Sequence, residues 1–153
     1  MALPFLHRFR ASLGGRSFER QLQRAETHHF WPLSMLGPDG PQLLMFEVLG
    51  LGEAAPRGAG IFIYARRREG EWQPLYIGES ANLADRLAFN EIAADALLSG
   101  ATDIHVLRLS NDTVARRDIV DRLILTNAPP LNEDDRIRLA SVAGEQKAKI
   151  RAA

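Results

Sequence analysis

The stretch of residues 60–86 constrains the fold more than any other part of the chain. Ile61–Ala65 combines β-branched and aromatic residues, which is typical of a strand, and the charged segment Arg66–Gly70 indicates a turn. Glu71–Ile77 reads as the return strand, and a short helical segment carrying Arg86 follows it. The sequence therefore predicts a β-hairpin that leads directly into a helix.

The rest of the sequence predicts further strands, and helices that pack on this hairpin. Asp103–Leu109 alternates apolar and polar residues, so it is expected to be the third strand of the sheet, with His105 on its solvent face. Further elements are expected at 43–49 (strand) and at 91–98, 113–126 and 133–153 (helices). The prediction is an α+β domain with a small three-stranded central sheet, divided into an N-terminal helical arm (1–35), the central domain (43–132) and a C-terminal helical tail (133–153).

The N-terminal segment has two apolar stripes at helical spacing, and five arginines accompany them. The stripes are Phe5, Leu6 and Phe9, then Phe18, Leu22 and Ala25. A helix packed on the domain with its arginines in water is the simpler interpretation; a basic arm for phosphates or a self-association contact is the other. His28–Pro32 is expected to form an aromatic turn, and its adjacent histidines would point to opposite sides, which does not favour a metal pair.

Composition excludes several classes of protein. Basic and acidic residues number 19 each, so the whole chain has no field that attracts nucleic acid or membranes, although a local patch is compatible with this balance. Cysteine is absent, which excludes disulfides and thiolate metal sites. No run reaches the roughly 20 apolar residues of a membrane span. We therefore expect a cytoplasmic location and no membrane partner.

Several short motifs in order and at fixed spacing resemble the GIY-YIG nuclease domain, a family with many bacterial members. They are Gly60-Ile61-Phe62, Tyr76-Ile77-Gly78, Asn82-Leu83, Arg86-Leu87, Leu123-Ile124 and Pro129-Pro130-Leu131-Asn132. The resemblance covers about residues 59–132. It implies the fold of that family and an ancestral activity in which one DNA strand is hydrolysed with one divalent metal ion, Mg²⁺.

The resemblance assigns three retained positions. Tyr76 matches the second motif tyrosine, which positions or activates water in the family. Arg86 matches the arginine that stabilises the phosphoryl charge, and its planar guanidinium suits phosphate oxygens. Asn132 matches the terminal asparagine, which ties its loop to the wall of the site.

Three other positions have lost the reactive group that the family carries. Phe62 replaces the first motif tyrosine, Asn90 replaces a histidine, and Val120 replaces the glutamate that holds the metal. Asp121 could hold the metal only if the helix were shifted from the expected register. Tyr64 could supply a hydroxyl near the one lost at Phe62, although its position two residues further on makes it a weak substitute.

Two main functions follow from this reading. The first is a catalytically degenerate module that binds nucleic acid or a protein partner; the alternative is an active Mg²⁺-dependent endonuclease that hydrolyses DNA. Arginines of the hairpin turn and of the two helices after it could line a phosphate-facing surface, and Asn132 is a further candidate for contact with nucleic acid. The arginines are Arg66, Arg67, Arg68, Arg86, Arg116, Arg117 and Arg122. A purely structural role, with the N-terminal helix as the contact, is the third possibility.

Overall fold

The computed structural model describes residues 27–35, 37–110 and 112–152. The expected N-terminal helix, residues 1–27, therefore lies almost wholly outside the described residues. Residues 28–34, which the predicted arm also included, form a strand.

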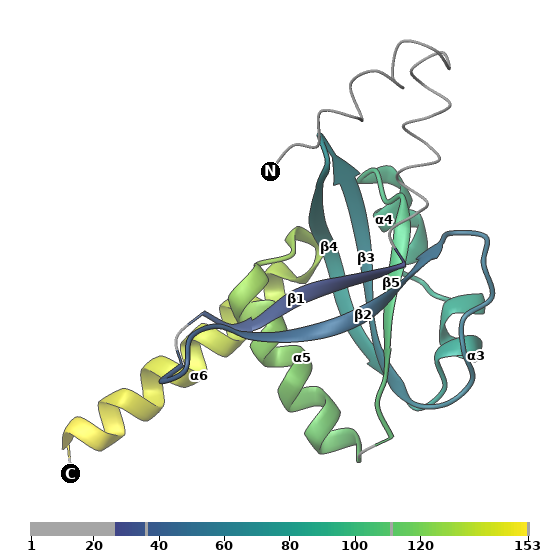
Figure 1. Ribbon diagram of the computed structural model, residues 1–153. Helices are drawn as coiled ribbons and strands as arrows, with labels where there is room; N and C mark the ends of the chain where they lie inside the picture. Colours follow the sequence, from purple (N-terminus) through teal and green to yellow (C-terminus); the bar gives the residue numbers. More distant parts are fainter. Residues whose placement is uncertain (1–26, 36, 111, 153) are drawn as a thin grey trace.

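The described part of the chain contains one five-stranded sheet, and all its paired strands are antiparallel. The strand order is β1-β2-β5-β3-β4, and the sheet curls into a half-barrel (Figure 1). The bounds are β1 His28–Ser34, β2 Gln42–Gly50, β3 Gly60–Arg68, β4 Glu71–Ser80 and β5 Asp103–Arg108.

The prediction of a three-stranded sheet is therefore wrong. The three strands expected in the sheet are present as β5, β3 and β4. The strand expected at 43–49 is present as β2, which pairs with β5 and adds the β1–β2 hairpin to the sheet. The predicted aromatic turn at His28–Pro32 is also wrong, because these residues lie in β1. Pro32 was compatible with a strand there because β1 is an edge strand, where a missing N–H costs no ladder bond.

The turn between β3 and β4 is shorter than the charged segment Arg66–Gly70 suggested. Arg66 and Arg67 lie within β3 and pair with Gln73 and Trp72 of β4. Glu69 and Gly70 close the hairpin with φ values of 53° and 83°. Positive φ at both positions matches the twist of antiparallel strands in tight hairpins.

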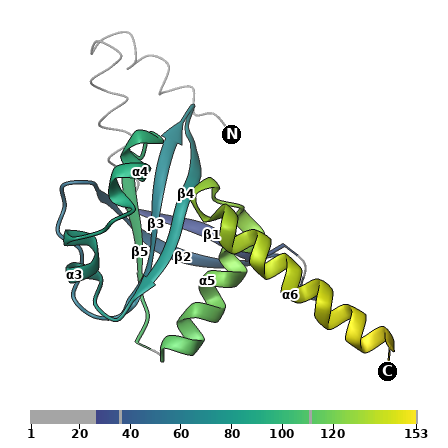
Figure 2. The ribbon, with the colours of Figure 1, turned by 180° about the vertical axis from the view of Figure 1, so that it is seen from behind.

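The helices are short except for the last two. Their bounds are α3 Leu83–Ala88, α4 Ala93–Leu98, α5 Thr113–Asn127, the 3-10 turn η1 Pro130–Asn132 and α6 Glu133–Ala152. Asp112 caps α5, since its Oδ1 accepts a hydrogen bond from the Ala115 amide at 2.8 Å. Figure 2 shows α3 and α4 on the side of β3 and β5 turned toward the viewer, whereas α6 projects from the body. No described residue of α6 is buried.

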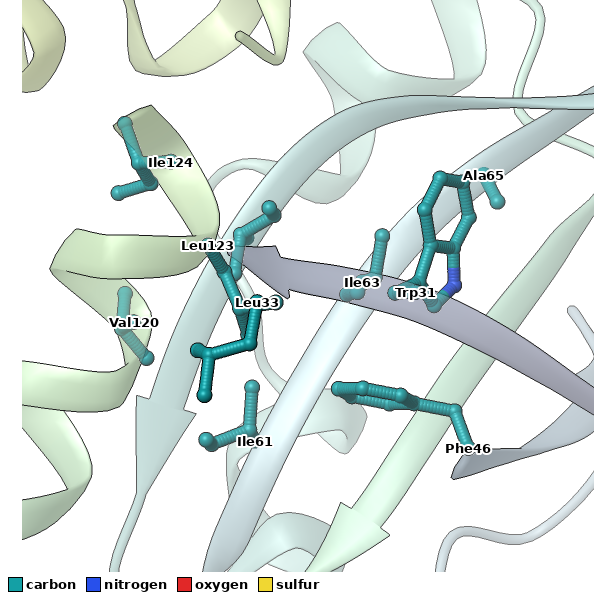
Figure 3. Close-up of a cluster of buried hydrophobic side chains, with 10 residues drawn as sticks. Trp31, Leu33, Phe46, Ile61, Ile63, Ala65, Val120, Leu123 and Ile124 are labelled. Carbon is teal, nitrogen blue, oxygen red and sulfur yellow. The ribbon is translucent and has the colours of Figure 1, made fainter. Parts of the chain in front are cut away.

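The first of two apolar cores fills the concave side of the sheet, as seen in Figure 3. Val120, Leu123 and Ile124 of α5 pack there against residues of β3 and of the β1–β2 hairpin. The β1–β2 residues Trp31, Leu33 and Phe46 face inward because strand side chains alternate between two sides. The added hairpin thus closes over a core that three strands alone would leave open.

His105 is fully buried, so its predicted place on the solvent face is wrong. Its strand β5 is an inner strand, paired on both sides, and the His105 ring points to the concave side. Trp31 Nε1 donates a hydrogen bond to His105 Nδ1 at 2.9 Å, and the Trp72 ring lies 4.5 Å from the imidazole. Burial, with His29 and Arg67 nearby, lowers the pKa of His105 to about 3, so the ring is neutral.

The second core lies on the opposite side of the sheet, under α3 and α4. Leu83 and Ala96 of these helices pack against Phe62, Tyr64 and Val106. The same alternation along β3 that sends Ile61 and Ile63 to the first core sends Phe62 and Tyr64 to the second. This second side carries the candidate functional residues.

Candidate functional site

The β3–β4 hairpin brings three aromatic rings together on one side of the sheet. Tyr64 lies directly opposite Tyr76 across the hairpin, and Phe62 lies opposite Gly78. The Phe62 ring centroid is 6.0 Å from that of Tyr64 and 6.0 Å from that of Tyr76. Phe62 and Tyr76, which the sequence assigned to one site, are therefore close neighbours.

Two glycines of the hairpin allow close approaches, Gly78 to the aromatic rings and Gly60 to the backbone of β5. A Cβ at Gly78 would lie 2.6 Å from Phe62 Cζ, and a Cβ at Gly60 would lie 2.3 Å from the Leu107 carbonyl oxygen. Real carbon atoms do not approach so closely, so a side chain at either position would displace its neighbour. Glycine at position 78 lets the Phe62 ring approach the backbone of β4 closely.

Arg86 on α3 reaches the tyrosine pair. It is half-buried, and its positive charge acts on the hydroxyls of both Tyr64 and Tyr76, which lowers their pKa values. Burial raises the pKa of Tyr76 above its ordinary value, and Arg86 partly offsets the rise. Both phenols therefore stay protonated at neutral pH and can donate hydrogen bonds.

Asn90 closes the cluster from the end of α3. Its Nδ2 donates a hydrogen bond to the Tyr64 hydroxyl oxygen at 3.3 Å. Burial raises the pKa of Tyr64, while this bond and the Arg86 charge act in the opposite direction. Sequence reasoning treated Tyr64 as a weak substitute for the hydroxyl missing at Phe62. The structure joins Tyr64 to Asn90 and Arg86, a link that no short-range pattern could indicate.

Beside Tyr76 an open cavity of about 390 Å³ lies between β4, α5 and the start of α6. Its polar lining residues are Tyr76, Glu79, Arg117, Asp121, Asp135 and Arg138. The structure thus brings Asp121 to the same cavity as Tyr76. Sequence reasoning missed Asp135 and Arg138, because it treated α6 as a separate tail.

The carboxylates of this cavity affect one another. Burial raises the pKa of Asp121, and the charges of Asp135 and Asp118 add to the rise, whereas Arg138 and Arg117 lower it. Asp135 also accepts a hydrogen bond from Asn132 Nδ2 at 3.1 Å and lies 3.6 Å from Arg138. The negative charges of Asp121 and Asp135 are thus partly offset by nearby arginines, and Asp135 also has a hydrogen-bond donor in Asn132.

The residues present do not match the expected metal centre. Val120, at the position where the resemblance leads us to expect a glutamate, is buried in the first core, and its side chain has no oxygen to offer. Within residues 27–35, 37–110 and 112–152, no group of three or more His, Cys, Asp or Glu side chains is placed to hold a metal ion.

Of the arginines predicted to line a phosphate surface, several have internal partners. Arg116 is buried, and its Nε donates to Glu79 at 3.0 Å. Arg67 stacks on the Trp72 ring at 5.0 Å, and Arg66 donates to Gln73 and to the Ser99 carbonyl. Arg68 is exposed at the hairpin end, away from Tyr76 along the strand. Arg117 and Arg138, at the cavity rim, are exposed as well.

Asn132 is a structural residue of this region. It is buried, and its Oδ1 accepts a hydrogen bond from the Ile77 amide at 2.7 Å while its Nδ2 donates to the Ile77 carbonyl at 3.1 Å. One side-chain amide thus pairs with the outer edge of β4 as another strand would. Its polar atoms are engaged inside the protein, so the predicted contact with nucleic acid is not available to them.

Comparison with known proteins gives no match for this chain, whether with family models, curated proteins or solved structures. None of the helices in the described ranges combines the length and the apolar character that crossing a bilayer requires.

Proposed function

We propose that this protein is a GIY-YIG-like module that has lost its cutting chemistry and binds a phosphate group of a nucleic acid. The observation that supports it is the cluster of Arg86 with the hydroxyls of Tyr64 and Tyr76. A guanidinium near two hydroxyl donors offers several hydrogen bonds to phosphate oxygens, and partial burial strengthens each of them.

The same groups are poorly suited to hydrolysis. Attack on a phosphodiester needs a group that takes a proton from water, and such a base works best with a pKa near the working pH. Burial moves the pKa values of Tyr64 and Tyr76 upward from 10, away from that range. Asn90 stands where the family has a histidine, and an amide cannot accept the proton. The cluster can thus hold a phosphate without activating water.

The charges around the site set the expected strength of binding. Arg117 and Arg138 lie at the rim of the adjoining cavity, but Asp121 and Asp135 line it too. We expect about three phosphate contacts in total, from Arg86 and these two rim arginines. For a single strand, three contacts reduce affinity about 20-fold between 50 mM and 200 mM salt.

The test is fluorescence anisotropy with labelled single-stranded and double-stranded oligonucleotides at several salt concentrations. We expect Arg86→Ala to weaken binding at least tenfold, because it removes a partly desolvated charge contact. Arg151→Ala is the matched control, because Arg151 is an exposed arginine at the far end of α6. We expect this variant to bind the oligonucleotides as tightly as the wild type does. Failure to bind either oligonucleotide at 50 mM salt would refute the proposal and favour a protein partner.

A nicking assay on supercoiled plasmid with Mg²⁺ or Mn²⁺ addresses the alternative, an active endonuclease. We expect no relaxed circle to accumulate above background. Cleavage that disappears in Arg86→Ala but persists in Arg151→Ala would show that the protein cuts DNA and that the degenerate reading is wrong.

A further inference from the structure

The outer side of the β1–β2 hairpin carries an apolar surface that nothing described covers. Phe30, Leu43 and Met45 are exposed by 55%, 53% and 51%. Phe30 lies directly opposite Met45, and Leu43 lies opposite Pro32, so the four residues form one patch. In Figure 1 these two strands lie in front of the rest of the molecule, and none of the labelled helices crosses them.

This patch contrasts with the other parts of the same sheet. The concave side is filled by α5 and by the inward residues of β1 and β2, and the outer side of β3 and β5 is covered by α3 and α4. Large side chains exposed in a contiguous group commonly mark a contact surface, whereas single exposed residues do not.

We propose that the N-terminal segment of this same chain covers the patch with the stripe Phe18, Leu22 and Ala25. The chain enters the sheet at Thr27, whose carbonyl oxygen accepts a hydrogen bond from the Val48 amide at 2.8 Å. The stripe thus ends two residues before the point at which the backbone is fixed beside β2. Connections between a helix and a strand are commonly two to six residues long.

The expected helix and the apolar patch have similar lengths. As a helix, residues 18–25 extend about 10 Å at 1.5 Å per residue. The patch extends about 7 Å along β1 from Phe30 to Pro32, at about 3.3 Å per residue. A helix that runs back over the hairpin from Thr27 places Ala25 near Phe30 and Phe18 near Leu43.

The arginines of the segment fit this orientation. Arg16, Arg20 and Arg24 fall on the side of the helix opposite the stripe, since successive residues turn by about 100°. Packing of the stripe on the patch therefore leaves all three guanidinium groups in water. The stripe of a second copy of the chain could also bind this patch. The experiments below distinguish binding within one chain from binding between two copies.

Oxidation of methionine by hydrogen peroxide gives the first test, with an internal reference. Met35 and Met45 are exposed to similar extents in the described structure, by 62% and 51%. If the segment covers the patch, Met45 in the full chain should oxidise at least fivefold more slowly than Met35. The double variant Phe18→Asp with Leu22→Asp should bring the two rates together. Equal rates in the unaltered chain would overturn the proposal.

Engineered disulfides give the second test. Because the chain has no cysteine of its own, only the two introduced thiols can form a disulfide. Oxidation of a chain with Leu22→Cys and Met45→Cys should give a bond within one chain, seen by mass and by mobility on a non-reducing gel. The matched control is Arg24→Cys with Met45→Cys, in which the first thiol points away from the patch. Equal yields in the two variants would overturn the proposal. A bond mainly between chains would assign the patch to a second copy instead. Neither result depends on the phosphate site.

Discussion

Replacement of Asn132 by leucine should be among the most destabilising single changes in this protein. Leucine is close to asparagine in size, so the change removes the two hydrogen bonds to Ile77 without opening a large cavity. Ile77 is 1% exposed, so water cannot replace the lost partners of its amide and carbonyl groups. An unsatisfied buried polar group costs about 1–3 kcal/mol, which gives about 2–6 kcal/mol for the pair.

This loss is a large fraction of the whole stability of a domain of this size, which is about 5–15 kcal/mol. The assay is urea unfolding followed by circular dichroism at pH 7.5. The matched control is Asp134→Leu, an exposed residue two positions further along the chain, which should change the free energy of unfolding by less than about 0.5 kcal/mol.

An Asn132→Leu variant that loses less than about 1 kcal/mol would refute the reasoning. It would mean that the edge of β4 finds other partners, and that the buried amide does not hold η1 against the sheet. An Asn132→Asp variant separates the two bonds. It keeps an acceptor for the Ile77 amide but has no donor for the Ile77 carbonyl, so it should also be destabilised.

Two further predictions concern the cores. The pKa of His105 is lowered to about 3 in the folded protein from about 6.5 unfolded, and burial lowers that of His29 as well. The stabilisation from neutral His105 is therefore complete above pH 6.5 and is lost as pH falls from there toward 3, by about 2 kcal/mol at pH 5. His105→Gln should reduce the difference in unfolding free energy between pH 7.5 and pH 5; an unchanged difference would contradict this. Gly78→Ala should destabilise the protein by about 1–3 kcal/mol, because the new methyl group overlaps the Phe62 ring. Phe62→Leu should relieve much of that loss in the double variant, measured by thermal unfolding; additive losses would show that the overlap is not the cause.

The local elements of the fold follow from the sequence. The β3–β4 hairpin, the helix with Arg86 and the capped helix α5 are each specified by residues within a few positions of one another. Alternation along β3 fixes which side of the sheet receives Phe62. The resemblance of this hairpin and helix to a known family, rather than their spacing alone, assigned Tyr76 and Arg86 to one site.

Only the tertiary structure decided the contacts between distant parts of the chain. The added β1–β2 hairpin buries His105, whose partner Trp31 lies 74 positions away. The Tyr64–Asn90 bond spans 26 positions, and the Arg116–Glu79 pair spans 37. Composition and periodicity indicate which face of a helix or strand is apolar, but they do not indicate which other element will cover that face. That choice depends on the packing of the whole chain.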